Sequence, residues 1–170
     1  MSRRDQIRMS EPELDSFLAG QRVVTCATIG PNGRPHLVPL WYVRRGPAIA
    51  CWTYARSQKT ANLRRRPLAT LQFEAGESYP ELRGATMECD ARLIDDVADV
   101  ADIGLALTLR YLPGEHALSD EHALSDEHPP AEATPDMRAF VQSQAHKRVG
   151  ILFTPTHTVT WDHRKLGGQY

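Results

Sequence analysis

The 170-residue chain lacks the features that would place it in several common classes of protein. No run approaches the roughly 18 apolar residues that a membrane-spanning helix requires. The first ten residues, "MSRRDQIRMS", have basic side chains but no apolar stretch behind them, so we expect no secretory signal. The sequence also has no GxGxxG, GxxxxGK[ST] or GxSxG, which leaves it without the usual dinucleotide, nucleotide and hydrolase motifs.

Cysteine is scarce. The three cysteines, Cys26, Cys51 and Cys89, lie far apart in apolar, strand-like surroundings and show no CxxC spacing. An odd number in such surroundings predicts reduced, buried thiols in a cytoplasmic protein. A catalytic cysteine is the alternative.

Charge of one sign is not in excess either. The 20 basic and 21 acidic residues give a net charge of −1 at pH 7. Domains that bind nucleic acid usually carry a clear basic excess, so we expect no nucleic-acid partner. The lack of a long apolar run likewise predicts no association with a membrane. Any anion must therefore be bound by a local cluster of basic residues.

The hydrophobic pattern predicts an α+β protein that is mainly β. A capping box at Ser10–Glu13 predicts a helix over residues 11–19, and a Pro-Asn-Gly turn predicts a hairpin between the first two strands. Apolar residues at helical spacing predict further helices over 96–111 and about 135–146. Strand-like runs lie at 22–29, 34–43, 48–53, 68–75, 84–94, 148–154 and 157–161.

These elements predict one domain over residues 1–170, an antiparallel barrel of six or seven strands with short flanking helices. The segment 113–134 contains a tandem copy of "EHALSD", and we expect an exposed loop there. Its histidines are six residues apart, which is not a helical metal-binding spacing, so we expect no metal site. Adventitious metal binding and a lid are the alternatives.

The segment "SQKTANLRRRP", residues 57–67, predicts a short basic helix. It holds one of only three lysines in a chain with seventeen arginines, and it contains no acid. Ser57 is a plausible N-cap, and Pro67 ends the helix. Because the start of a helix offers unpaired amides and a partial positive charge, this helix could bind a phosphate near Lys59. The alternative is a solvated basic surface.

The preceding hairpin supports a ligand site. Pro35 and Pro39 cannot donate to a strand ladder, so they mark an edge strand or an irregular stretch. Such a stretch leaves backbone amides free for a flat ring with carbonyls along one edge. Trp41 and Trp52 could cover the ring, or they could pack in the core.

"VVTCATIGPNGRPHLVPLWYV", followed by "SQKTANLRRRPLATLQF", resembles the pyridoxamine 5′-phosphate oxidase-like split-barrel proteins, which bind flavin or deazaflavin. The resemblance is closest to their actinobacterial F420-dependent oxidoreductases and covers about residues 12–95. The final "TVTWDHRKL" is similar to a C-terminal element of some members. The resemblance implies a split β-barrel and a homodimer with the cofactor between subunits.

The resemblance also implies a set of site residues. Lys59 and Ser57 would hold the cofactor phosphate, supported by Asn62, Arg64 and Arg56. Trp161 and Lys165 would reach the site from the partner chain. The cofactor ring would contact mainly the backbone of Pro39, Leu40, Trp41 and Tyr42.

The expected function is F420-dependent hydride transfer to a small electron-poor substrate such as an enone, a quinone or a tetrapyrrole. No catalytic nucleophile is needed, and the proton donor could be His36, Lys165 or solvent. The excess of arginine suits the carboxylates of the F420 tail. The alternatives are an FMN-dependent oxidase or reductase of the same fold, and a non-catalytic carrier of flavin, deazaflavin or heme.

Overall fold

The computed structural model describes residues 2–111 and 133–167, and its centre is one seven-stranded sheet in the order β2-β1-β5-β6-β7-β4-β3. The strands are β1 (Val24–Ile29), β2 (Pro35–Leu40), β3 (Val43–Arg45), β4 (Ala48–Tyr54), β5 (Leu68–Ala75), β6 (Arg83–Ile94) and β7 (Arg148–Asp162). The α-helices are α1 (Arg3–Gln6), α2 (Glu11–Gly20), α3 (Gln58–Arg65), α4 (Val97–Tyr111) and α5 (Pro135–Ala145).

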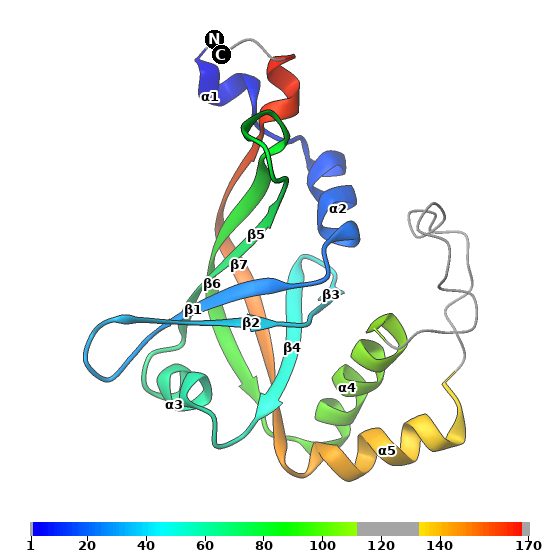
Figure 1. Ribbon diagram of the computed structural model, residues 1–170. Helices are drawn as coiled ribbons and strands as arrows, with labels where there is room; N and C mark the ends of the chain where they lie inside the picture. The colour runs from blue at the N-terminus through cyan, green and yellow to red at the C-terminus, as the bar shows by residue number, and fades with distance from the viewer. Residues whose placement is uncertain (1, 112–132, 168–170) are drawn as a thin grey trace.

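Every strand pair is antiparallel, so the expected α+β antiparallel split barrel is confirmed. Figure 1 shows α1, α2 and the end of β7 at one end of the molecule and α3 at the other, with α4 and α5 beside β4. Among the described residues, no helix is both long and apolar enough to cross a membrane. Most of the loop predicted over 113–134 lies outside the described residues.

The prediction of one strand over residues 34–43 was wrong. That run forms β2 and β3, which are the two opposite edges of the sheet, and the chain crosses between them at Trp41 and Tyr42. The continuous apolar pattern concealed the break because the sequence stays apolar across it, from Leu40 through Trp41 and Tyr42 to Val43. Pro35 and Pro39 do lie on an edge strand, as their missing amide donors predicted.

The prediction of two final strands was also wrong, because residues 148–162 form the single long strand β7. Pro155 pairs with Cys89 and His157 pairs with Glu88, so Thr156 is an extra residue at a bulge. The Thr156 hydroxyl donates to the Glu88 carbonyl at 3.1 Å and holds the bulge in place. The bulge accommodates a proline that had appeared to end the strand.

The crossing between β2 and β3 is stabilised by the last residues of α4. The Tyr111 hydroxyl accepts from the Tyr42 amide at 3.1 Å and donates to the Tyr42 carbonyl at 3.0 Å. The Tyr42 ring is fully buried, and its hydroxyl donates to the Leu18 carbonyl at the end of α2. Arg110 donates to the carbonyls of Leu18, Ala19 and Gln21, which satisfies groups that a helix end leaves without partners.

Two apolar clusters form the core. The larger one fills the barrel, with Phe73, Leu71 and Phe153 fully buried, and the smaller one lies between α4 and β4. In the smaller cluster, a Cβ at Gly104 would lie 2.4 Å from a ring carbon of Trp52. Glycine therefore allows α4 to pack directly against that indole.

We expect Tyr111→Phe to lower the free energy of unfolding by about 1–3 kcal/mol, because it leaves the buried amide and carbonyl of Tyr42 without partners. Urea denaturation measures this change. Tyr54→Phe is the matched control, because that hydroxyl is on an exposed residue and bonds to no other described residue. Equal losses in the two variants would contradict the role of Tyr111.

Candidate functional site

Helix α3 begins directly after β4 and packs beside β1 and β6 (Figure 1). Ser57 is its N-cap and accepts from the Thr60 amide at 3.4 Å. The two hydroxyls lie 3.0 Å apart, and the Thr60 hydroxyl donates its single hydrogen to the Tyr54 carbonyl. The Ser57 hydroxyl must therefore donate to the Thr60 hydroxyl. With its bond from the Thr60 amide, both contacts of this side chain stabilise the first turn of α3.

Lys59, in the first turn of α3, is a half-buried cation without a counter-charge. Its Nζ donates to the Thr53 hydroxyl at 2.7 Å, and it has no carboxylate partner among the described residues. Desolvation by burial lowers the pKa of the ammonium below its ordinary value of 10.5, while the thiols of Cys26 and Cys51 act weakly in the opposite direction. A partly desolvated charge is costly unless it is paired, so an anion beside Lys59 would be stabilising.

Other donors lie next to Lys59. The amides of Gln58 and Lys59 bond to no described residue, as expected for the first turn of a helix. Arg56 precedes the helix, is exposed, and likewise has no partner in the described part of the chain. We call Arg56, Gln58 and Lys59 the phosphate seat. Its amides, guanidinium and ammonium are all donors, and this donor set fits a phosphate group.

The rest of the basic helix has other partners. Arg64 forms an ion pair with Asp95 at 2.8 Å, and Arg65 donates to the Ile29 carbonyl at the end of β1 at 2.7 Å. Asn62 is fully buried, and its amide group donates to the Thr28 hydroxyl at 3.0 Å. The expected support of a phosphate by Asn62 and Arg64 thus stays a prediction, since the structure gives each a different contact. Sequence reasoning missed the role of Arg65, because its acceptor is a carbonyl on another strand.

The four residues expected to contact the cofactor ring differ in how exposed they are. Tyr42 is buried, and its amide is already bonded to Tyr111. Trp41 is 56% exposed and stacks on the Tyr111 ring, with 4.6 Å between centroids and 6° between planes. Pro39 is exposed and Leu40 is half-buried on β2. Of these four, Trp41 presents the aromatic surface.

Neither of the two clefts described below includes Trp41 or a residue of the phosphate seat. Trp41 follows the end of β2 that is remote from the hairpin turn, whereas α3 contacts β1 near that turn through Arg65 and Ile29. Trp52 packs against Gly104, and the Arg148 guanidinium lies 4.4 Å from its ring. Trp52 is thus a packing residue between β4 and α4.

His36 and Lys165, the two predicted proton donors, lie in different regions. His36 faces Thr28 across the β1–β2 pair, and its Nδ1 is buried without a partner among the described residues. Lys165 donates to the Arg8 carbonyl at 2.7 Å and to Glu13 at 2.6 Å, at the end of the molecule that carries α2. Trp161 lies on β7, where its indole covers Gly84 of β6. Within one chain, only His36 lies near α3.

Two clefts lie away from the phosphate seat, and both are lined partly by α2. One, of about 290 Å³, lies between α2, the start of β6 and the end of β7. The other, of about 280 Å³, lies between α2 and strands β4, β6 and β7. Neither includes a residue of the phosphate seat, so the cationic helix and the clefts are separate features of the surface.

These features define a class of protein: a split antiparallel barrel with a cationic helix, α3, packed beside its edge hairpin. The family profile described as pyridoxamine 5′-phosphate oxidase matches residues 10–142. The chain belongs to the pyridoxamine 5′-phosphate oxidase family. Among curated protein sequences, none matches it.

Solved structures show the same fold. The conserved hypothetical protein Rv2991 from Mycobacterium tuberculosis is 33% identical, with a TM-score of 0.82 over 100% of this chain and 95% of that chain. A protein named F420 reductase is 19% identical, with a TM-score of 0.57 over 85% and 94% of the chains. HutZ, the heme storage protein from Vibrio cholerae, is 12% identical, with a TM-score of 0.63 over 91% and 97%. The last two identities are low, so those likenesses concern the fold alone.

We expect Lys165→Met to raise the pKa of the Glu13 carboxyl, which the bonds from Lys165 and Ser10 lower from 4.5 to about 2. Because the pKa is lowered in the folded state, the stabilisation is present above pH 4.5 and is lost as the pH falls towards 2. Carboxyl ¹³C NMR titration measures the change.

Lys147→Met is the control for this titration, because it removes the same charge from an exposed position between α5 and β7, away from Glu13. The Glu13 pKa should not respond to it. A Glu13 pKa that stays at about 2 in Lys165→Met would refute the ion pair between Lys165 and Glu13.

Proposed function

We propose that this protein is an F420-dependent oxidoreductase that acts on a small electron-poor organic substrate. The observation that carries the proposal is Lys59, a half-buried ammonium without a carboxylate partner among the described residues, in the first turn of α3. The family membership and the shared fold with an F420 reductase support it.

The residues of the chain would bind and orient the cofactor. Lys59 and the amides of Gln58 and Lys59 would hold the phosphate, and Arg56 would bind a nearby anionic group of the tail. Trp41 would offer a flat apolar surface for the ring. The chemistry that reduced F420 supplies is hydride transfer to a substrate such as an enone, a quinone or a tetrapyrrole.

His36 is the better placed proton donor within one chain. Its Nδ1 is buried and has no partner among the described residues, and its strand neighbour Thr28 bonds to Asn62 of α3. Lys165 is bonded to Glu13 and to the Arg8 carbonyl, and it would have to come from a partner subunit. Since His36 and Trp41 lie at opposite ends of β2, no single donor is singled out: His36, the partner subunit's Lys165 or solvent would protonate the product.

FMN is the alternative cofactor, and one observation favours it. Because Arg64 is paired with Asp95 and Arg65 with the Ile29 carbonyl, few cations on α3 remain for the carboxylates of a long F420 tail. The shorter tail of FMN needs fewer. A non-catalytic carrier is the third reading, since HutZ, named as a heme storage protein, shares the fold.

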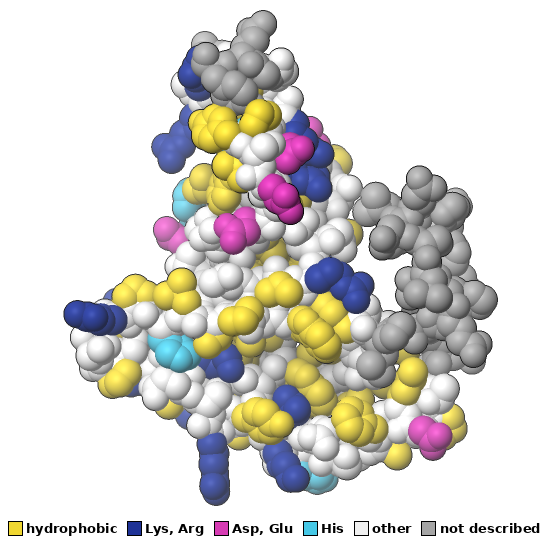
Figure 2. Space-filling view, in the orientation of Figure 1, with side chains coloured by type: hydrophobic (Ala, Val, Ile, Leu, Met, Phe, Trp, Pro, Cys, Tyr) yellow, Lys and Arg dark blue, Asp and Glu magenta, His cyan; other side chains and the backbone are white. Residues whose placement is uncertain are grey.

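We also propose a homodimer whose subunits meet through the outer face of β1 and β2. Figure 2 shows hydrophobic side chains spread over these strands, and Leu37 on β2 is 60% exposed. Pro35 and Pro39 remove amide donors from the β2 edge, which disfavours edge-to-edge pairing and leaves the apolar face as the surface for contact. Such a dimer would let Trp161 and Lys165 of one subunit approach the ligand of the other.

Fluorescence titration of the apo-protein should show saturable binding of F420 in the micromolar range, with much weaker binding of FMN. Lys59→Ala should weaken F420 binding by about 1.5–3 kcal/mol, because a charge-assisted bond to phosphate is lost. Arg66→Ala is the control, since Arg66 is exposed at the other end of α3 and its side chain has no partner among the described residues.

Three results would change the proposal. Tight FMN binding with weak F420 binding would assign the protein to the flavin-dependent branch. Unchanged affinity in a folded Lys59→Ala variant would eliminate the phosphate seat. If neither cofactor binds, the carrier reading is tested by titration with heme.

Sedimentation velocity should show a dimer for the wild type and a monomer for Leu37→Asp, because a buried carboxylate would destabilise the apolar interface. Phe140→Asp introduces the same charge at a side chain that is 57% exposed on α5, and it should leave the dimer intact. A dimer that survives Leu37→Asp would show that this face is not the interface.

A further inference from the structure

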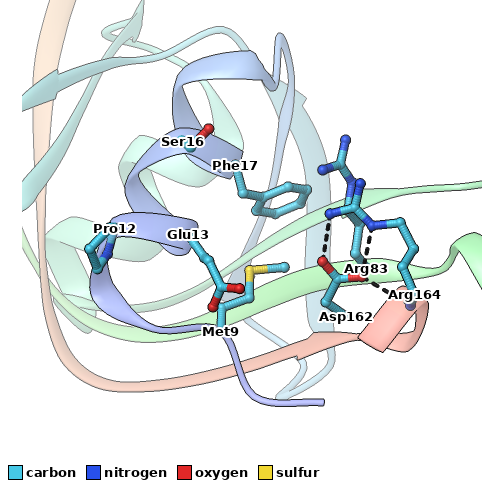
Figure 3. Close-up of a pocket in the computed structure, with 8 residues that line it drawn as sticks. All are labelled: Met9, Pro12, Glu13, Ser16, Phe17, Arg83, Asp162 and Arg164. Atoms are coloured by element: carbon cyan, nitrogen blue, oxygen red, sulfur yellow. Dashed lines mark hydrogen bonds and ion pairs between the residues drawn. The ribbon is translucent and has the colours of Figure 1, made fainter. Parts of the chain in front are cut away.

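The cleft between α2 and the end of β7 lies at the end of the molecule opposite α3 (Figure 1). Its volume is about 290 Å³, close to the lower limit for small-molecule sites. Figure 3 shows Arg83 and Arg164 side by side on one wall and the side chains of α2 on the other. We call this space the α2 cleft.

Arg83 is the unpaired cation of the α2 cleft. It is half-buried, and its guanidinium carbon lies 5.3 Å from the centroid of the Phe17 ring. This contact holds the side chain while leaving its N–H groups without an acceptor among the described residues. A held guanidinium with free N–H groups is suited to bidentate recognition of a planar anion.

The carboxylates around the cleft are already bonded to other cations. Asp162 accepts from Nε and a terminal nitrogen of Arg164, at 2.9 and 2.6 Å, and so uses both of its oxygens. Glu13 accepts from Lys165 at 2.6 Å and from the Ser10 amide at 2.7 Å. Arg83 therefore forms no direct ion pair with a described residue, although Asp162 lies opposite it in the β6–β7 register. The hydrogen bonds from Arg164, helped by the charge of Arg83, lower the pKa of the Asp162 carboxyl.

The remaining lining residues are Ser16 and three apolar residues. Met9, Pro12 and Phe17 line the cleft on the side of α2 (Figure 3). Met9 is anchored, because its amide donates to the Thr160 hydroxyl of β7 at 2.9 Å. One free guanidinium beside apolar walls matches a ligand with a single negative charge at one end and an apolar body.

We propose that the α2 cleft binds a small organic monocarboxylate, with the carboxylate on Arg83 and the apolar body against Met9, Pro12 and Phe17. A carboxylate is favoured over phosphate because it is planar, carries one charge and leaves no oxygen facing the apolar wall. The site shares no residue with the phosphate seat, so it does not rest on the proposed F420 or FMN binding.

Benzoate is the probe, and the methyl ¹³C signal of Met9 reports on the cleft. In protein labelled at its four methionines, benzoate should shift the Met9 signal saturably and leave the Met137 signal on α5 in place. Benzamide, which has the same shape without the charge, should bind at least about tenfold more weakly, because the charge-assisted hydrogen bonds are lost.

Arg83→Met should weaken benzoate binding about tenfold or more. Arg83→Lys keeps the charge and the fold but loses the planar fork, so it should bind with intermediate affinity. Arg92→Met is the matched control, because Arg92 is an exposed residue of the same strand whose side chain has no partner in the described part of the chain.

Three results would overturn the proposal. The first is equal affinity for benzoate and benzamide, and the second is unchanged benzoate binding in Arg83→Met. The third is inorganic phosphate that displaces benzoate at equal concentration, which would show a general anion site without a role for the apolar wall.

Discussion

The crossing of the chain at Trp41 and Tyr42 is the constraint on which the rest of the structure depends. Because β2 and β3 are consecutive in sequence but form opposite edges of the sheet, the link between them lies outside every strand ladder. Its backbone groups are buried and need partners, which the Tyr111 hydroxyl supplies to Tyr42. The same few residues also bind the end of α2, through Arg110 and the Tyr42 hydroxyl. The hydrogen bonds of Tyr42, Arg110 and Tyr111 therefore hold the β2–β3 crossing, α2 and α4 in place relative to one another.

The pattern of ion pairs decides which cations are available for ligands. Most basic side chains near the two candidate sites are already bonded: Arg64 to Asp95, Arg164 to Asp162 and Lys165 to Glu13. Lys59 and Arg83 are half-buried and have no carboxylate partner among the described residues. They lie at opposite ends of the sheet, so a phosphate at one end and a carboxylate at the other would not compete. The near-neutral net charge conceals this arrangement, because it sums over paired and unpaired groups alike.

Part of the candidate site could be predicted from local sequence. The helix that begins after Ser57 and ends before Pro67 follows from short-range capping and steric rules, and so does the placement of Lys59 in its first turn. The contacts of Asn62 and Arg65 could not be predicted, because Thr28 and the Ile29 carbonyl lie on a strand more than 30 residues earlier. Arg83 gave no signal at all in the sequence, since Phe17, which holds it, comes from the distant helix α2.

The sequence by itself determined the class of fold, the order of its helices and most of its strands, and the position of the basic helix. Those properties depend on hydrophobic period, turn residues and caps, which act over a few residues. Only the tertiary structure decided that residues 34–43 divide between two sheet edges and that β7 continues through Pro155. It also decided which charges are paired. Strand partners, bulges and ion pairs join residues that are remote in the chain, so no local pattern specifies them.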